Sequence, residues 1–327
     1  MNNNSNGLIV GFGSALVDIL INEDDNFLEL VNAAKGGMLL VDLSVLSEAL
    51  SNTSAIPTIV PGGSACNTII GVARLGGPAR FVGKRGSSKM GELFESDLKK
   101  NRVEPMLLQS TTPTGRVLSI ITPDAQRSML TYLGASAEAK PDEINDSCFK
   151  DAAIVHIEGY LLFNEALITA VLIGAKNNGA LVSIDLASYT VVEATKSVLE
   201  NLIKKYVDII IANEDEAMAF TGHSNENDAI KALSEKADYA VLKVGKRGSY
   251  IAHNNDVLRI DPIGSGPAVD TTGAGDLWAS GFLYGLANKF PLELCGKLGS
   301  ACGYEVCQVI GANIPDQGWN RIKEILP

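Results

Sequence analysis

The sequence predicts an α/β protein in which a mostly parallel central sheet lies between two layers of helices, with a small separate β-sheet beside it. Short apolar runs alternate with longer stretches of helical periodicity along most of the chain, and this alternation is typical of parallel strands connected by helices. Two segments instead contain consecutive strand-like runs. At 327 residues the chain is long enough to bury a large core.

The alternating part of the chain defines the expected elements in order. The expected strands are 8–12, 79–82, 154–157, 181–185, 209–212 and 239–244. The expected helices are 65–75, 91–101, 164–177, 191–205, 214–221, 228–235, 275–288 and 292–309. Gly76 and Gly222 directly follow two of these helices, which supports their ends because glycine readily adopts the left-handed backbone at a helix C-terminus.

Residues 19–41 and 104–133 interrupt the alternation. Runs such as 116–121 and 128–132 are strand-like, and no helical stretch separates them. Each segment is too short to bury an apolar face alone, so we expect the two to pair in one small sheet. This sheet would form a lid over a main domain of residues 1–18, 42–103 and 134–327, and a lid can exclude water from a reaction.

Composition and charge exclude several classes of function. The net charge of -11 and a pI near 4.8 argue against a nucleic-acid or anionic membrane partner. No apolar run is long enough to span a bilayer, and residues 1–7 lack the parts of a signal peptide. Five cysteines without a Cys-x-x-Cys pair are typical of reduced thiols, so a cytoplasmic location is expected. The histidines show no zinc-ligand spacing, and neither a P-loop nor a dinucleotide glycine pattern occurs.

Residues 270–276 read Asp-Thr-Thr-Gly-Ala-Gly-Asp and lead directly into an apolar helical stretch. Gly273, Ala274 and Gly275 let the backbone bend tightly and expose its amides. The helix start adds unpaired N–H groups and the positive end of its dipole, so the turn predicts an anion site, most naturally for phosphate. Asp276 would repel phosphate unless it takes the proton from a hydroxyl that attacks phosphorus. Helix capping is the alternative explanation.

The segment 270–276 resembles the signature of the ribokinase-like (PfkB) carbohydrate and nucleoside kinases. A second motif of that family is matched at residues 61–68, Pro-Gly-Gly-Ser-Ala-Cys-Asn-Thr, and the resemblance extends over most of the chain. It implies a ribokinase-like three-layer α/β/α sandwich with a β-sheet lid. It also implies an enzyme that transfers the γ-phosphate of ATP, with Mg²⁺, to a hydroxymethyl group of a sugar or nucleoside. Segments 35–38, 132–136 and 158–161 are most similar to the bacterial adenosine-kinase-like branch.

The resemblance implies acceptor contacts from Asp18, Gly62, Gly63, Asn67 and Glu158. Asp18 follows the first predicted strand by a short turn, at the edge where open α/β sheets bind ligands, and it matches the family's acidic residue that holds vicinal hydroxyls. Gly62 and Gly63 would let the backbone approach the sugar, and Asn67 would add an amide that donates and accepts. The alternatives are a solvated loop carboxylate for Asp18, an ordinary turn for the glycines and a surface side chain for Glu158.

Nucleotide contacts are implied for a second strand end and for the lid. Lys243, Gly245 and Gly248 resemble the family's ATP corner, where small residues make room for ribose and adenine. Gly275 would contribute from the turn of residues 270–275, which we call the anion turn. An ordinary strand-connecting turn is the alternative. Arg127 lies in the expected lid and could pair with the transferring phosphoryl group on closure. A surface arginine is an equal alternative.

Cation sites are implied at two places. Asn213 and Glu216 lie three residues apart and resemble the family's Asn-x-x-Glu element, which organises Mg²⁺ through water. The same spacing is the signature of a capping box, and both explanations can hold. Asp270 and the backbone near Thr272 match the loop that binds a monovalent cation, K⁺, in many relatives. The basic loop 84–91 departs from the acidic pattern of many relatives, which puts acceptor contacts there in doubt.

We therefore expect a kinase that binds a small sugar or nucleoside, as a monomer or homodimer. The rival hypothesis is a binding protein that kept this fold, lost catalysis and senses a sugar or nucleotide. The retained Asp276 and the intact glycine turn argue against the rival.

Overall fold

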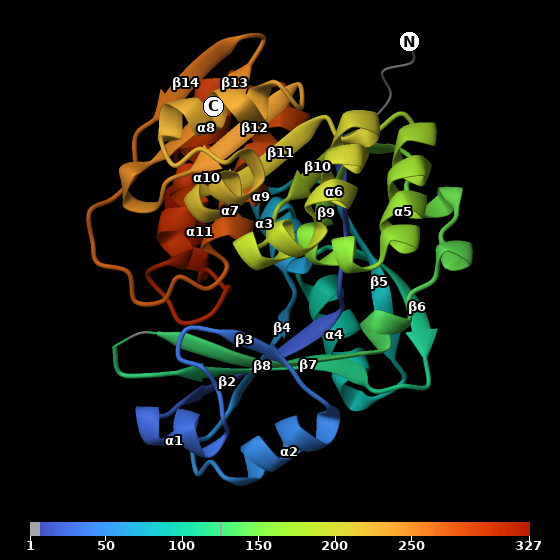
Figure 1. Cartoon of the computed structure of the whole chain (residues 1–327), viewed down its shortest axis with the longest axis vertical. Coiled ribbons are helices and arrows are strands. Elements are labelled where there is room, and N and C mark those ends of the chain that lie inside the picture. The colour runs from blue at the N-terminus through green and yellow to red at the C-terminus, as the bar shows by residue number, and fades with distance from the viewer. Residues whose placement is uncertain (1–6, 125) are drawn as a thin grey trace.

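The computed structural model describes residues 7–124 and 126–327, and the strands of this part form one sheet of nine and one of five (Figure 1). The large sheet has the order β14-β13-β12-β11-β10-β9-β1-β5-β6. Its strands are β1 Leu8–Phe12, β5 Ala79–Gly86, β6 Glu104–Ser110, β9 Ala152–Glu158, β10 Leu181–Asp185, β11 Ile209–Asn213, β12 Tyr239–Lys243, β13 Ser249–His253 and β14 Asp256–Ile260. All pairs from β12 to β6 are parallel, whereas β13 is antiparallel to both of its neighbours.

Helices cover both faces of the large sheet, which confirms the predicted three-layer α/β/α sandwich. One layer contains α5 Glu165–Asn177, α6 Tyr189–Tyr206, α7 Glu214–Thr221 and α8 Glu226–Ser234. The other contains α3 Ser64–Leu75, α4 Lys89–Lys100, α9 Ala274–Ala287, α10 Leu292–Val306 and α11 Asp316–Lys323. Along β9, Val155 and Ile157 face the first layer while Ile154 faces the second. Successive residues of this buried strand therefore pack into two different hydrophobic cores.

The small sheet has the order β3-β8-β7-β2-β4 and lies beside the carboxyl ends of the parallel strands (Figure 1). Its strands are β2 Leu16–Asn22, β3 Met38–Leu40, β4 Thr58–Gly62, β7 Thr114–Ile121 and β8 Arg127–Gly134. One face packs against two short helices, α1 Asp25–Leu30 and α2 Leu43–Ser51, through a separate apolar cluster that includes Ile19, Leu46 and Leu118. The opposite face is turned toward the main body.

The helix α1 was not expected in residues 19–41. The Asp24 carboxylate accepts the backbone N–H of Phe27 at 3.1 Å, and this N-cap starts a helix whose short length leaves little periodicity to detect. The helix matters for the sheet because Phe27 and Leu28 are buried against the face that the strands alone would leave exposed.

The small sheet also uses other residues than the two expected segments. The strand β6 lies in the large sheet as the parallel neighbour of β5, although it belongs to the expected segment 104–133. Conversely, β4 is antiparallel to β2 in the small sheet, although 58–62 lies in the expected main domain. Strand character is visible in a sequence, but the partner of a strand depends on contacts between distant residues. Residues 1–6 and 125 of the expected domains lie outside the described residues.

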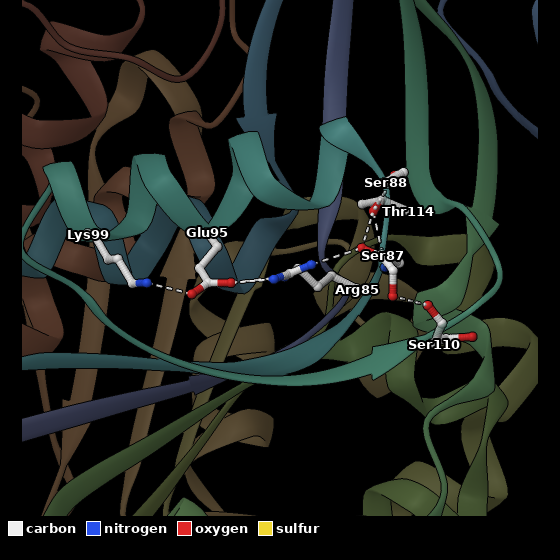
Figure 2. A network of polar contacts seen from close by, with 8 residues as sticks. Arg85, Ser87, Ser88, Glu95, Lys99, Ser110 and Thr114 are labelled. Atoms are coloured by element: carbon white, nitrogen blue, oxygen red, sulfur yellow. Dashed lines mark hydrogen bonds and ion pairs between the residues drawn. The ribbon is translucent and has the colours of Figure 1, made fainter.

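A polar network joins the two sheets where the chain passes from β6 to β7 (Figure 2). Thr114, the first residue of β7, accepts the backbone N–H of Gly86 at 3.1 Å through its hydroxyl, which also lies 3.3 Å from the Ser88 hydroxyl. The Arg85 guanidinium donates to the carbonyl of Gly86 and to Glu95 of α4. This passage is therefore tied to both the end of β5 and the start of α4.

Candidate active site

A cavity of about 610 Å³ lies between the carboxyl ends of the parallel strands and the inner face of the small sheet. Residues of both sheets and of the α9 start line it. Ligands of open α/β sheets bind at this edge, so the cavity is the candidate active site. No helix within residues 7–124 and 126–327 is both long and apolar enough to cross a membrane.

Four parallel strands present a polar residue to the cavity at their last position. These residues are Glu158 of β9, Asp185 of β10, Asn213 of β11 and Lys243 of β12. Asp185 lies opposite Glu158 in the register of the sheet, and Asn213 lies opposite Lys243. The strand register thus collects side chains that are up to 85 positions apart in the sequence.

Asp276 lies in the first turn of α9, directly after the anion turn. Gly273 is the N-cap of this helix with a left-handed φ of 72°, a conformation that glycine adopts without a steric penalty. The Asp276 carboxylate accepts the Ser64 hydroxyl at 2.6 Å and the Asn67 side-chain amide at 2.9 Å. Burial raises the pKa of Asp276 despite these two donors, and a carboxylate with a raised pKa is a better proton acceptor.

Asp18 lies on β2 and is buried at the inner face of the small sheet. Burial raises its pKa to about 6, with Arg127 opposing the rise and the charge of Asp276 adding to it. A Cβ on Gly62 would lie 2.4 Å from the Asp18 carboxylate, so Gly62 makes room for this side chain. Gly63 lines the cavity and has a φ of 96°. Asp18 is therefore not a solvated loop carboxylate, which was the alternative explanation.

Glu158 is also buried, with 1% of its surface exposed. Its carboxylate accepts the backbone N–H groups of Ser14 at 2.8 Å and of Ala65 at 3.2 Å. Burial raises its pKa, while the Ser14 and Ala65 amides oppose the rise. The side chain lines the cavity, but both of its oxygens are engaged by the backbone.

Lys243 forms a buried ion pair with Asp185, at 2.8 Å between Nζ and Oδ2. Burial alone would lower the pKa of Lys243, but Asp185 and Glu216 outweigh it and raise the pKa. A Cβ on Gly275 would lie 3.0 Å from the same Nζ, so the ammonium group faces the anion turn. This arrangement places a positive charge beside the turn that the sequence predicts as an anion site.

Asn213 and Glu216 form the capping box that their spacing indicated. The Asn213 side chain accepts the N–H of Glu216 at 2.9 Å, and Glu216 accepts the N–H of Asn213 at 2.8 Å. Burial and the neighbouring Asp185 raise the pKa of Glu216 to about 7. In the described part of the chain, no cluster of three or more His, Cys, Asp or Glu residues is arranged to hold a metal ion.

Arg127 joins the small sheet to the anion turn. Its guanidinium donates to the Thr272 hydroxyl at 2.6 Å, and Thr272 in turn donates to Asp270 at 2.7 Å. Asp270 also accepts the N–H of Gly311 at 2.8 Å. A chain of hydrogen bonds thus runs from β8 through the anion turn to the loop that follows α10.

The structure does not bring all predicted residues into the cavity. Gly245 and Gly248 lie in the β12–β13 turn, outside the residues that line it. Ser64 and Asp185 were not predicted, although Asp185 ends a predicted strand and its position carried a usable signal. Lys84 lines the cavity, but its ammonium group donates to Glu143 and to the carbonyl of Glu138.

A cavity between two sheets, with a half-buried carboxylate in the first turn of a helix that begins at a glycine turn, fits a phosphotransferase that acts on a hydroxyl group. Residues 32–318 match the family model described as pfkB family carbohydrate kinase. The chain therefore belongs to the pfkB family of carbohydrate kinases, and it is a kinase that uses an alcohol group as acceptor.

Several known proteins are similar to this chain over most of its length. The 5-dehydro-2-deoxygluconokinase of Geobacillus thermodenitrificans is 29% identical over 81% of this chain and 84% of its own length. A probable sugar kinase from Rhizobium etli has a similar structure, with a TM-score of 0.90 at 30% identity, covering 98% of both chains. The adenosine kinase of Sinorhizobium meliloti has a TM-score of 0.89 at 31% identity, covering 97% of this chain and 98% of its own.

Proposed function

We propose that this kinase transfers the γ-phosphate of ATP, in the presence of Mg²⁺, to an exocyclic hydroxymethyl group of a nucleoside or sugar. The observation that carries the proposal is the position of Asp276, a half-buried carboxylate that lines the cavity in the first turn of α9, directly after the anion turn. Asp276 takes the proton of the attacking hydroxyl, and the amides of 273–275 stabilise the charge that develops on the phosphoryl oxygens.

The phosphates of ATP lie along the anion turn in this proposal. Lys243 faces Gly275 and supplies positive charge, and Arg127 reaches the same turn from the small sheet. Asn213 and Glu216 would hold Mg²⁺ through water, and the bound ion would neutralise phosphate charge. Asp270, which accepts the N–H groups of Thr272 and Gly311, would hold K⁺ together with the backbone near Thr272.

The inner face of the small sheet favours a nucleoside as acceptor. Asp18 lies in one cross-strand row with Val117, Thr131 and Leu40, and all four residues line the cavity. Beyond the carboxylate the row is therefore mostly apolar, and the adjacent pair Met38 and Met129 extends the apolar surface.

The main body adds further apolar surface to the lining of the cavity through Phe163, Leu161 and Leu167. A hexose offers hydroxyls around its whole ring and would leave them unpaired against such walls. A nucleoside matches both parts, because Asp18 accepts the ribose hydroxyls and the flat base contacts the apolar surfaces.

We further propose a cytoplasmic enzyme that acts as a monomer or homodimer on small molecules. The five cysteines are all free thiols, which is typical of a reducing compartment.

Turnover of ATP on a panel of acceptors tests the proposed function. The panel contains purine and pyrimidine nucleosides, ribose and fructose, with Asp276→Asn as the matched inactive control. Rapid ADP release with a nucleoside, abolished in the variant, is the expected result. Preference for a free sugar would refute the nucleoside assignment alone. Tight binding of a panel member without any ADP release would instead favour the rival sensor function.

A further inference from the structure

The chain crosses between the two sheets at two places, which we call passages. The first passage consists of two stretches of backbone that lie together, the β1–β2 connection and the β4–α3 connection. The chain leaves β1 at Phe12 and enters β2 at Leu16, and it returns from β4 directly into α3. These outgoing and returning stretches touch, because a Cβ on Gly63 would lie 2.5 Å from the Ser14 carbonyl oxygen. Any movement of the small sheet must bend the chain here.

Glu158 bonds to both stretches from the end of β9. One carboxylate oxygen accepts the N–H of Ser14 in the outgoing stretch, and the other accepts the N–H of Ala65 in the returning one. Space is tight around the group, since a Cβ on Gly13 would lie 2.4 Å from Oε2. A hydroxyl of the acceptor would have to compete for oxygens that already accept backbone amides.

The returning stretch also holds Asp276. Ser64 and Asn67, in the first turn of α3, donate to its carboxylate. The Thr68 hydroxyl donates to the Asp276 carbonyl at 3.1 Å. The same helix turn therefore contacts Glu158 through Ala65 and orients the base at the start of α9.

We propose that Glu158 is a positioning residue that couples the small sheet to the catalytic base, and that it does not bind the acceptor. The Glu158 carboxylate fixes Ser14 relative to the start of α3. Ser14 leads into the strand that carries Asp18, and the start of α3 holds Asp276, so the bonds of Glu158 keep Asp18 and Asp276 in a fixed relative position. This inference rests on the proposed function, because Asp276 is the base only in that function. It replaces the acceptor contact that the sequence indicated for Glu158.

The second passage supplies a matched control. Glu95 of α4 accepts Arg85 and Lys99 in the network of Figure 2. Like Glu158, it is a glutamate at a connection between the sheets. Its network reaches Thr114 rather than the α3 start, so Glu95→Gln disturbs a passage without touching the contacts of Asp276.

Glu158→Gln keeps the volume but offers an amide nitrogen to one of the two N–H groups, so one bond is lost. We expect kcat to fall about 10²-fold, the typical cost of misplacing reacting groups by about 1 Å, with the KM for ATP unchanged. Amide hydrogen exchange should accelerate at Ser14 and Ala65. Glu158→Asp keeps the charge but is one methylene shorter, and should give an intermediate kcat. Glu95→Gln should leave kcat and both amides as in the wild type.

Any other outcome would refute either this proposal or the proposed function on which it rests. A raised acceptor KM at unchanged kcat, with unchanged exchange at Ser14 and Ala65, would make Glu158 an acceptor ligand. A wild-type kcat in Glu158→Gln overturns the coupling. If that variant does not fold, Glu158→Asp is judged by the same measurements. If the wild type transfers phosphate to no acceptor, the proposed function fails. In that case, unchanged amide exchange at Ser14 and Ala65 in Glu158→Gln would refute the proposal that Glu158 holds the two backbone stretches together.

Discussion

Replacing Asp18 by asparagine should make the protein more stable and a poorer enzyme. The pKa of Asp18 rises from 3.8 to about 6 in the folded protein, chiefly through burial. The folded state therefore binds more protons than the unfolded state between about pH 4 and pH 6, and the free energy of unfolding falls as the pH rises through this window. Each pH unit of difference is worth about 1.4 kcal/mol, so the charged carboxylate costs up to about 3 kcal/mol above pH 6.

Asp18→Asn removes this cost because asparagine is neutral and nearly the same size. At pH 8 its free energy of unfolding should exceed that of the wild type by up to about 3 kcal/mol. The difference should vanish below about pH 4, where Asp18 is protonated in both states. The variant also loses a charged hydrogen-bond acceptor, so acceptor affinity should fall by about 1.5–3 kcal/mol.

Guanidinium unfolding at pH 4, 6 and 8, together with the acceptor KM, measures both effects. Asp261→Asn is the control, since this carboxylate is 87% exposed and its replacement should change neither quantity. Equal stability of Asp18→Asn and the wild type at pH 8 would refute the assigned desolvation. An unchanged acceptor KM, with ATP binding lost instead, would show that the two ligand sites had been exchanged.

Three further outcomes are expected. Asp276→Asn should lower kcat by about 10²–10⁴-fold, the usual contribution of positioned proton transfer; calorimetry should find ATP binding retained, and near-wild-type turnover would remove Asp276 from the base role. Lys243→Met should weaken ATP binding and cost about 3–5 kcal/mol in thermal unfolding, because it leaves Asp185 charged and unpaired in the interior. Adding Asp185→Asn should restore part of that stability, and no recovery would contradict the ion-pair explanation. Acceptor plus an ATP analogue should slow amide exchange in the small sheet but not in the central parallel strands; unaltered exchange at saturation would contradict a closing lid and leave Arg127 with only its contact to the anion turn.

The local elements and the anion turn could be predicted from the sequence. Periodicity records which residues a local segment buries, and glycines mark where a helix stops, so strands such as β1 and β10 were predicted with the same bounds that the structure has. The anion turn and Asp276 are contiguous in the sequence. Their glycines and carboxylate, which together indicate phosphoryl transfer, therefore lie within seven residues. Asp18 and Glu158 were identified through the resemblance to the kinase family, and both lie near the ends of predicted strands.

The tertiary structure decided what depends on distant partners. Periodicity does not name the neighbour of a strand, which is why β6 and β4 belong to the opposite sheets from those expected. The contact between Arg127 and Thr272 joins residues 145 positions apart. The sequence showed Glu158 directly after a predicted strand, but its two backbone partners are known only from the structure, because they lie on the outgoing and returning stretches of the first passage, packed at the end of β9. A residue type states which bonds a side chain can make, whereas burial and register determine which of them it makes.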